Sequence, residues 1–280
     1  MRFQAPARGA VSAAFLAHPI AEGFPHLHSL LKGDWPDLAT LNALLGAVHH
    51  PISGAQLHFV PQTRALQADG LHYEARIFHH GAIATRAQNW HDLFNAVCWL
   101  DRHALKCAVN HAYVQELEDG STQERSRRQA ALTHFDEAGA VVITRNAARL
   151  AAWDAHDWES LFLSDRGMLG RDFRLCIFGH ALLEHCLEPA IFPVAKCLVL
   201  AADPALPAEA ALPALARAIA CGRVLADPQE LRPLPLAGFP GWHPRNDSLA
   251  FYREAPCFRP LRPGRRYPPP WPASRECNAP

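Results

Sequence analysis

The segment from residue 89 to residue 111, NWHDLFNAVCWLDRHALKCAVNH, is rich in side chains that can do chemistry. His91 and Asn95 are four residues apart, so a helix would place them on one face. A histidine can move a proton near neutral pH, and an asparagine can orient a neighbouring group. His111 can join them only if the chain folds back near Asp101. We therefore take His91, Asn95 and His111 as candidate catalytic residues.

A second candidate group lies in the sequence GHALLEH, residues 179–185. His180 and Glu184 are also spaced by four residues, and such a pair can supply two ligands to a divalent cation or hold a histidine with a carboxylate. We expect His91, His180 and Glu184 to form the metal set, with metal optional. A simple hydrogen bond within the helix explains the pair equally well. Neither segment matches HExxH, a P-loop, GxSxG or a zinc-finger spacing.

Other groups have a structural and a functional interpretation. Arg86 could bind a carboxylate or phosphate of a cofactor, but a structural salt bridge is the commoner role of such an arginine. Asp136 and Glu137 stand at the end of a predicted helix, where they could be ligands or ordinary turn residues. The polar stripe around His91 could itself be a buried network whose members satisfy one another.

The elements that must position these residues are mostly helical. Residues 89–117 predict a helix in two pieces, broken near Asp101, and GHALLEH predicts a helix ended by Pro189. Residues 55–63 and 71–81 predict the two strands of a hairpin that turns at Gly70. A helix capped by Asp34 should precede this hairpin, and buried strands are expected over residues 140–144 and 195–200.

The whole pattern predicts an α+β fold, with one helix-dominated domain over residues 1–260. Its small sheet would be covered by the helices and by a Pro-rich C-terminal segment that begins near Leu231. Residues 261–280 are rich in Pro and Arg, and we expect this tail to be disordered. Basic and aromatic residues alternate there, a pattern that could contact nucleic acid or anionic lipid.

Composition restricts the partners and the location. The 27 basic residues balance the 27 acidic ones, so no strong overall signal for nucleic acid arises. The eight cysteines contain no CxxC pair, which predicts reduced thiols in a cytoplasmic protein. The apolar stretches fall short of the ~20 residues that a spanning helix needs, and no signal peptide is evident, so no membrane association is expected.

Several blocks of the sequence resemble a known family. They are YEARIFHHGAIATRAQNWHDLFNAVCWL, LTHFDEAGAVV, FGHALLEH and LPLAGFPGWHP, and with their surroundings they cover about residues 55–260. This order is similar to that of an uncharacterised bacterial family, domain of unknown function 3025 (DUF3025). The chain departs from the family pattern at Arg102-His103-Ala104, where the family has Phe-Pro-Arg, and at Arg128-Gln129, where it has Arg-Asp. The resemblance implies no activity, because none is assigned to the family.

The residues themselves favour a cytoplasmic enzyme, most plausibly a hydrolase, with a small-molecule substrate in a His/Asn/Glu cleft. His91 would be the base or a metal ligand, His180 a second ligand held by Glu184, and Asn95 an orienting group. The alternative is a non-catalytic binding or scaffold protein in which NWHDLFN is a structural polar core. The sequence leaves the oligomeric state open.

Overall fold

The computed structural model describes residues 5–11, 13–119, 125–206 and 208–272 of the 280-residue chain. These residues form fifteen α-helices and seven strands in two sheets, which confirms the predicted helix-dominated α+β class. The helices are α1 (Ala13–Leu16), α2 (Pro19–Glu22), α3 (Pro25–Leu30), α4 (Leu38–Leu45), α5 (Arg64–Gln67), α6 (Tyr73–His80), α7 (Trp90–Asp101), α8 (His103–Asp119), α9 (Arg127–Ala138), α10 (Ala147–Asp154), α11 (Trp158–Phe162), α12 (Leu169–Asp172), α13 (His180–His185), α14 (Ala208–Ala220) and α15 (Leu249–Glu254). The strands are β1 (His58–Pro61), β2 (Ala82–Thr85), β3 (Gly139–Thr144), β4 (Phe173–Ile177), β5 (Val194–Ala201), β6 (Arg232–Pro235) and β7 (Trp271–Pro272).

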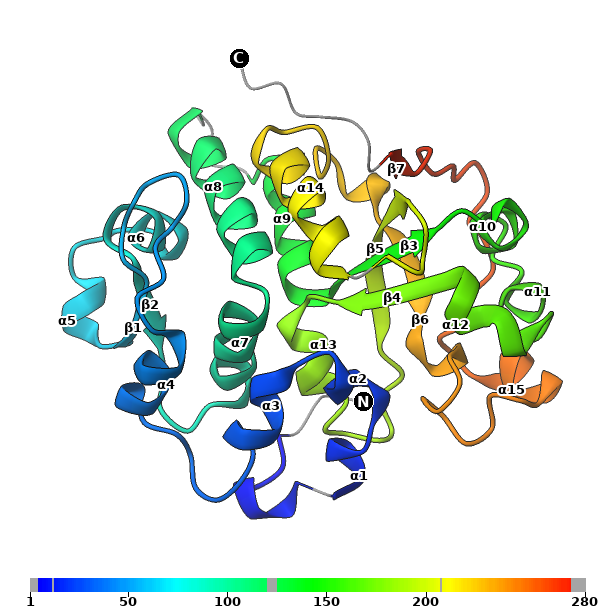
Figure 1. Cartoon of the computed structure of the whole chain (residues 1–280), viewed down its shortest axis with the longest axis horizontal. Helices are drawn as coiled ribbons and strands as arrows, with labels where there is room; N and C mark the ends of the chain where they lie inside the picture. The colour runs from blue at the N-terminus through cyan, green and yellow to red at the C-terminus, as the bar shows by residue number, and fades with distance from the viewer. Residues whose placement is uncertain (1–4, 12, 120–124, 207, 273–280) are drawn as a thin grey trace.

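The larger sheet has the strand order β4-β3-β5-β6, with β7 pairing with the end of β5 (Figure 1). Strand β3 runs parallel to β5 and antiparallel to β4, while β6 runs antiparallel to β5. Alternate side chains of β3 enter two different clusters, Val141 and Ile143 in one and Ala140 and Val142 in the other. The sheet is therefore buried on both faces, as the unbroken apolar run over residues 140–144 predicts.

Helices cover the two faces of this sheet. Apolar residues of α8, α9 and α14 pack with Val141 and Ile143, whereas α7, α10, α11 and α15 contribute to the larger cluster around Val142. In Figure 1, α8, α9 and α14 lie together above the sheet, and α10, α11 and α15 lie to its right. The Pro-rich segment after Leu231 supplies β6 and β7, so it joins the sheet as well as covering it.

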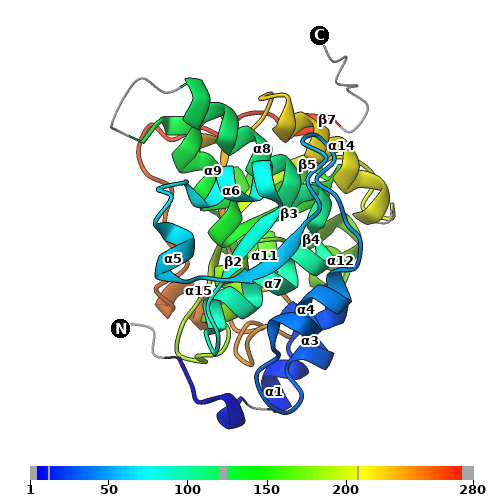
Figure 2. The ribbon, with the colours of Figure 1, turned by 90° about the vertical axis from the view of Figure 1, so that its left-hand side faces the viewer.

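The predicted hairpin of residues 55–63 and 71–81 is wrong, although its first strand is present as β1. Strand β1 pairs in parallel with β2, with Phe59 opposite Ile83, and α6 lies between them in the sequence (Figure 2). A parallel pair needs a crossover connection, and α5 and α6 provide it. His72 caps α6 by accepting the Glu74 N–H, and Gly81 ends it at φ 67°. These local hydrogen bonds override the strand-like alternation of the sequence.

The helix expected to be capped by Asp34 is capped by Asp37 instead. The Asp37 carboxylate accepts the Thr40 N–H at 2.8 Å, and the helix begins at Leu38. The predicted break near Asp101 is confirmed, because α7 ends at Asp101 and α8 begins at His103. The Asp101 carboxylate accepts the His26 N–H of α3 at 3.3 Å and lies 2.6 Å from His26 Nδ1.

Three further expectations from the sequence concern membrane-spanning helices, disulfide bonds and the C-terminal tail. Within the described ranges, no helix combines the length and the apolar character needed to cross a membrane. No disulfide links any two cysteines of those ranges. Residues 261–272 are described and include β7, while residues 273–280, the rest of the tail expected to be disordered, lie outside the described residues.

Candidate functional site

The first part of the site comes from α7. Asn89 caps this helix by accepting the Asp92 N–H at 3.0 Å, and Trp90, Leu93 and Phe94 bury its apolar face. Helix α13 packs directly against α7. His91 contacts Glu184 and His180 of α13, whereas Asn95, on the same predicted polar stripe, bonds to Tyr73 of α6 and Lys106 of α8.

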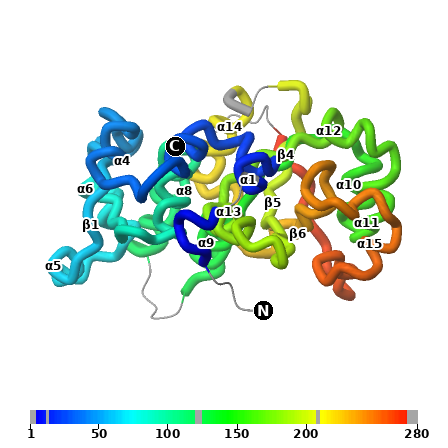
Figure 3. The backbone as a smooth tube through the Cα atoms, turned by 90° about the horizontal axis from the view of Figure 1, so that it is seen from below, coloured from blue at the N-terminus to red at the C-terminus, as the bar shows by residue number. Residues whose placement is uncertain are grey.

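The second part depends on a close contact between the start of α13 and the end of α9, near the centre of Figure 3. The N–H groups of Phe178 and Gly179 both donate to the Gly139 carbonyl, at 3.0 and 2.8 Å. A Cβ on Gly179 would lie only 2.5 Å from the Glu137 carbonyl oxygen and 2.4 Å from Gly139 N. Glycine at position 179 therefore lets the backbones approach closely enough to bring His180 beside Glu137.

Three donor atoms meet where these helices converge. His180 Nε2 lies 3.0 Å from His91 Nε2 and 3.4 Å from Glu137 Oε2, and His91 Nε2 lies 3.9 Å from Glu137 Oε1. Two ligands of a tetrahedral zinc, each about 2.1 Å from the metal, are separated by about 3.4 Å. The two imidazole nitrogens lie close to this separation, and each lies nearest to a different oxygen of Glu137. With one ligand atom taken from each residue, all three atoms lie within 4.8 Å of one another, so the three side chains are close enough to share one metal ion.

The outer nitrogens of both imidazoles face carboxylates. Glu184 Oε2 lies 3.0 Å from His91 Nδ1, and Asp136 Oδ2 lies 3.7 Å from His180 Nδ1. A carboxylate behind a metal-binding histidine fixes its tautomer and leaves the other nitrogen free for the metal. Nδ1 of the buried His180 has no hydrogen-bond partner among the described residues. With a metal on Nε2, this nitrogen would carry the proton and donate toward Asp136.

The charge state of the two histidines is set by opposite effects. The hydrogen bond with Glu184 raises the pKa of His91, against the effect of its partial burial, with help from Glu137. Burial lowers the pKa of His180 to about 3, and Lys106 and His91 add to this effect although Asp136 opposes it. The neutral imidazole of His180 thus keeps a lone pair at neutral pH, and the site favours one positive charge between the two rings.

We call His91, Glu137 and His180 the metal triad. A network of polar side chains lies next to it. The buried Lys106 donates to Asp136 Oδ1 at 2.6 Å and to Asn95 Oδ1 at 2.9 Å, and Asn95 Nδ2 donates to the Tyr73 hydroxyl at 2.9 Å. Burial would raise the pKa of Asp136, but Lys106 and His180 outweigh it and hold the pKa below its ordinary value. Asp136 therefore stays ionised behind His180.

Glu74 adds a second titratable group. Its Oε2 accepts from Asn110 Nδ2 at 2.6 Å. Removal from water, assisted by the nearby charge of Asp136, raises the pKa of Glu74 to about 7, although Lys106 and Asn110 oppose the rise. A carboxyl group with a pKa near neutrality is suited to exchange protons with a ligand.

These groups open onto a cleft of about 360 Å³. Its lining includes the three donor-bearing residues, both acidic neighbours Glu74 and Asp136, and the polar side chains of Tyr73 and Asn95. The volume is sufficient for a small organic molecule. The same cleft therefore contains three side chains that could bind a metal ion and a carboxyl group that titrates near neutral pH.

Some of the predicted site residues line this cleft and others lie outside it. His91, Asn95 and His180 line the cleft, and Glu184 lies behind His91 rather than beside the other donor atoms. His111 does not line the cleft, and its ring stacks on Phe78 with the centroids 5.5 Å apart.

Arg86 lines the cleft but is paired with Asp92. Its Nη2 and Nε atoms lie 2.7 and 3.0 Å from the Asp92 carboxylate oxygens. Sequence reasoning left Glu137 open between a ligand and a turn residue, and it gave no role to Glu74, which fell in a predicted strand. One signal for Glu137 was available in the sequence. Leu132 and Thr133 precede Asp136 and Glu137 by four residues, so a helix places all four on one face, and all four line the cleft.

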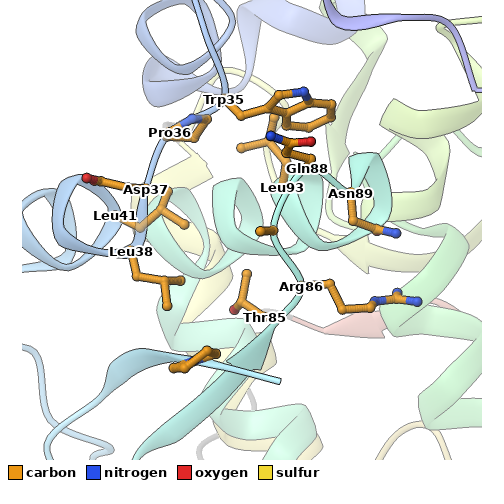
Figure 4. Close-up of a pocket in the computed structure, with 12 residues that line it drawn as sticks. Trp35, Pro36, Asp37, Leu38, Leu41, Thr85, Arg86, Gln88, Asn89 and Leu93 are labelled. Atoms are coloured by element: carbon orange, nitrogen blue, oxygen red, sulfur yellow. The ribbon is translucent and has the colours of Figure 1, made fainter. Parts of the chain in front are cut away.

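A second cavity of about 360 Å³ lies on the other side of Arg86 (Figure 4). Trp35, Leu38 and Leu41 form much of its wall, and the Arg86 side chain extends away from the two leucines. It brings together no group of metal-ligating side chains among the described residues, whereas His91, Glu137 and His180 form such a group in the first cleft. The first cleft is therefore the stronger candidate for chemistry.

Comparison with known proteins identifies a family. The family model described as "Protein of unknown function (DUF3025)" matches residues 57–262, a range that contains the whole triad. No curated protein and no solved structure matches the chain. The resemblance seen in the sequence blocks is thus confirmed, and the chain belongs to the DUF3025 family.

Proposed function

We propose that this protein is a metal-dependent hydrolase that binds one divalent cation through His91, His180 and Glu137. The carrying observation is the convergence of three ligating side chains: one ligand atom from each lies within 4.8 Å of the other two, and the two imidazole nitrogens are 3.0 Å apart, close to the separation of two ligands on one zinc ion. The substrate would be a small molecule held in the adjoining cleft of about 360 Å³. A cytoplasmic location, inferred from the cysteine pattern, is part of the same proposal.

The donor set favours zinc or a similar transition metal. Two imidazoles and one carboxylate are typical ligands of catalytic zinc, whereas magnesium and calcium prefer oxygen donors alone. Three protein ligands leave a fourth position for water or substrate. A bound zinc ion supplies hydrolytic chemistry by activating that water and polarising a carbonyl or phosphoryl oxygen.

The surrounding residues would each have a defined role. Glu184 accepts the proton on His91 Nδ1 and so presents Nε2 to the metal. Asp136, kept ionised by Lys106, lies 3.7 Å from His180 Nδ1 and would attract the proton on that nitrogen once a metal occupied Nε2. Asn95 on α7 bonds to Lys106 on α8 and to the Tyr73 hydroxyl on α6. These two hydrogen bonds would keep α7 in position relative to α6 and α8.

Glu74 would exchange protons with the substrate or the attacking water. It lines the same cleft, and its pKa of about 7 lets it accept and release a proton under one set of conditions. A general acid or base placed this way contributes about 10²–10⁴ to the rate of a reaction.

The test combines metal content with activity. The untagged protein, loaded with zinc and desalted, is measured by plasma mass spectrometry alongside the variants His91→Ala, His180→Ala and Glu137→Ala. We expect about one zinc per chain in the natural protein and at least a tenfold loss of retained zinc in each variant, because ligand loss removes a metal bond. The exposed residue His28 gives a matched control, His28→Ala, which should retain zinc.

Activity is then measured on p-nitrophenyl acetate and bis-p-nitrophenyl phosphate. Hydrolysis of at least one compound should require zinc and should fail in the three variants but not in His28→Ala. Zinc retention without hydrolysis of any ester would reject the enzyme proposal while leaving the metal site. An absence of zinc, with the variants folded, would reject both and favour a binding or scaffold protein with a polar core.

A further inference from the structure

A separate cavity of about 630 Å³ lies between β5, β6 and the segment that follows α15. In Figure 1 this segment runs from α15 past α11 and α10 to β7. The walls contain four prolines, which are Pro228, Pro233, Pro235 and Pro260, and the ring of Trp158. Rigid walls and an aromatic ring are typical of a preformed small-molecule pocket.

All the formally charged side chains that line this cavity are positive. Lys196, Arg259, Arg262 and Arg265 line it, together with His134, His156 and Tyr267. No aspartate or glutamate belongs to the lining, and within the described ranges no carboxylate forms a salt bridge with any of the four cations. Because the whole chain has balanced charges, four unpaired cations around one cavity are a local concentration.

Lys196 is the one of the four cations that lies on a strand of the larger sheet. It lies on β5, opposite Pro233 on β6 and Gly139 on β3, and is half-buried. Burial lowers its pKa, Cys197 opposes this change, and the like charges of Arg262, Arg265 and Arg259 each lower the pKa by a smaller amount. Such mutual repulsion is unfavourable without an anion, and an anion in the cavity would relieve it.

The nearest acidic residues are already engaged elsewhere. Asp227 is paired with Arg127 at 2.5 Å, and Asp154 is paired with Arg232 at 2.6 Å. Arg265 donates to backbone carbonyls of Gln229 and Leu231, and its guanidinium lies 4.5 Å from the Tyr267 ring centre. These contacts fix the position of Arg265. Its charge contributes to the lowered pKa of Asp227, but among the described residues it forms no salt bridge.

We propose that the cavity lined by Lys196, Arg259, Arg262 and Arg265 is a binding site for a phosphorylated small molecule. Phosphate is the anion whose charge and multiple acceptor oxygens best match several arginines and a lysine at once. Trp158 and the proline walls would contact the organic part of the ligand. The site is independent of the proposed metal triad, since the two share no lining residue.

The arrangement of the aromatic rings favours a small ligand over a nucleic acid strand. A single-stranded nucleic acid binds along an open basic groove with successive aromatic platforms for its bases. Here Tyr267 is covered by Arg265 on one side and lies beside His156, with ring centres 6.0 Å apart. Its ring is thus occupied within the protein, which leaves no row of open platforms among the cavity residues.

The test is isothermal titration calorimetry of the full-length protein with adenosine 5′-monophosphate and inorganic pyrophosphate, with adenosine as the uncharged probe. We expect binding of at least one phosphate compound, weaker at 200 mM than at 50 mM salt, and no binding of adenosine. Lys196→Met and Arg262→Gln should each raise the Kd at least about tenfold, because each removes a charge-assisted contact.

Matched controls show whether the phosphate compound binds in this cavity or elsewhere on the protein. Lys32→Met and Arg64→Gln, which alter residues outside the cavity, should leave the Kd unchanged, and Lys196→Arg should restore binding lost in Lys196→Met. His180→Ala should also retain binding, because the metal triad lies elsewhere. The proposal is overturned if no phosphate compound binds, or if the Kd is unchanged in Lys196→Met and Arg262→Gln. It is also overturned if His180→Ala abolishes binding, or if a dT12 oligonucleotide binds while both phosphate compounds do not.

Discussion

At the scale of single residues, the short contact between two imidazoles is the most informative feature. His91 Nε2 and His180 Nε2 lie 3.0 Å apart, and two bare lone pairs at that distance would repel each other. A proton or a metal cation between them removes the repulsion. Glu137 adds a negative charge at 3.4 Å from His180 Nε2, which stabilises a cation there. This arrangement is why we assign Glu137, rather than Glu184, as the third ligand.

The residue behind His91 gives a first prediction. We expect Glu184→Gln to weaken zinc binding by about 10–100-fold while leaving about one site per chain, because Glu184 orients a ligand without being one. Competition with a fluorescent zinc chelator measures the Kd. Glu118→Gln alters an exposed glutamate and serves as the control. Complete loss of the site in Glu184→Gln would instead make Glu184 a direct ligand.

A second prediction concerns pH. The pKa of Glu74 is raised to about 7 in the folded protein, so the folded state holds its proton where the unfolded state has released it. Ionisation therefore costs stability as pH rises from about 4.5 to about 7, by at most about 3 kcal/mol. Glu74→Gln cannot ionise, so its stability relative to the natural protein should increase over this range and then level off. Urea unfolding at a series of pH values measures the difference, and a constant difference would contradict the assigned pKa.

At the scale of elements, the contact between the α9–β3 junction and the start of α13 holds the ligands together. We expect Gly179→Ala to cost at least about 1–3 kcal/mol and to weaken zinc binding, because its Cβ would meet backbone atoms at 2.4 to 2.6 Å. Gly170→Ala is the matched control, since a Cβ there meets nothing within 4 Å. Thermal melts and zinc titrations of both variants test this. Equal behaviour of the two variants would show that the junction does not position His180.

The elements that local sequence patterns define were predictable, and those that depend on distant contacts were not. The α7–α8 break, the buried β3 and the turn-to-turn spacing of His91 with Asn95 follow from local patterns, and these predictions match the structure. The helix α6 was missed because its start and end depend on His72 and Gly81, whose capping roles the alternating pattern concealed. Glu137 could not be paired with His180 from sequence, because their contact rests on backbone hydrogen bonds from Phe178 and Gly179 to Gly139.

At the scale of the whole molecule, the proposed metal would join α7, α9 and α13, which are far apart in the chain. A ligand that binds only the folded state stabilises it by about 2.7 kcal/mol when its free concentration is 100 times its Kd. We therefore expect zinc to raise the melting temperature of the natural protein and of Lys196→Met, but not of His180→Ala. Differential scanning calorimetry with and without zinc measures this. An equal rise in His180→Ala would place the stabilising zinc at another site.

The most direct test of the central claim is a crystal structure of the zinc-loaded protein with anomalous diffraction recorded on both sides of the zinc absorption edge. We predict one strong anomalous peak about 2.0–2.2 Å from His91 Nε2, His180 Nε2 and a Glu137 carboxylate oxygen, with Glu184 still bonded to His91 Nδ1. A peak bound by Glu184 in place of Glu137 would contradict the assigned ligand set. A map without a peak between the two imidazoles would contradict the metal site altogether.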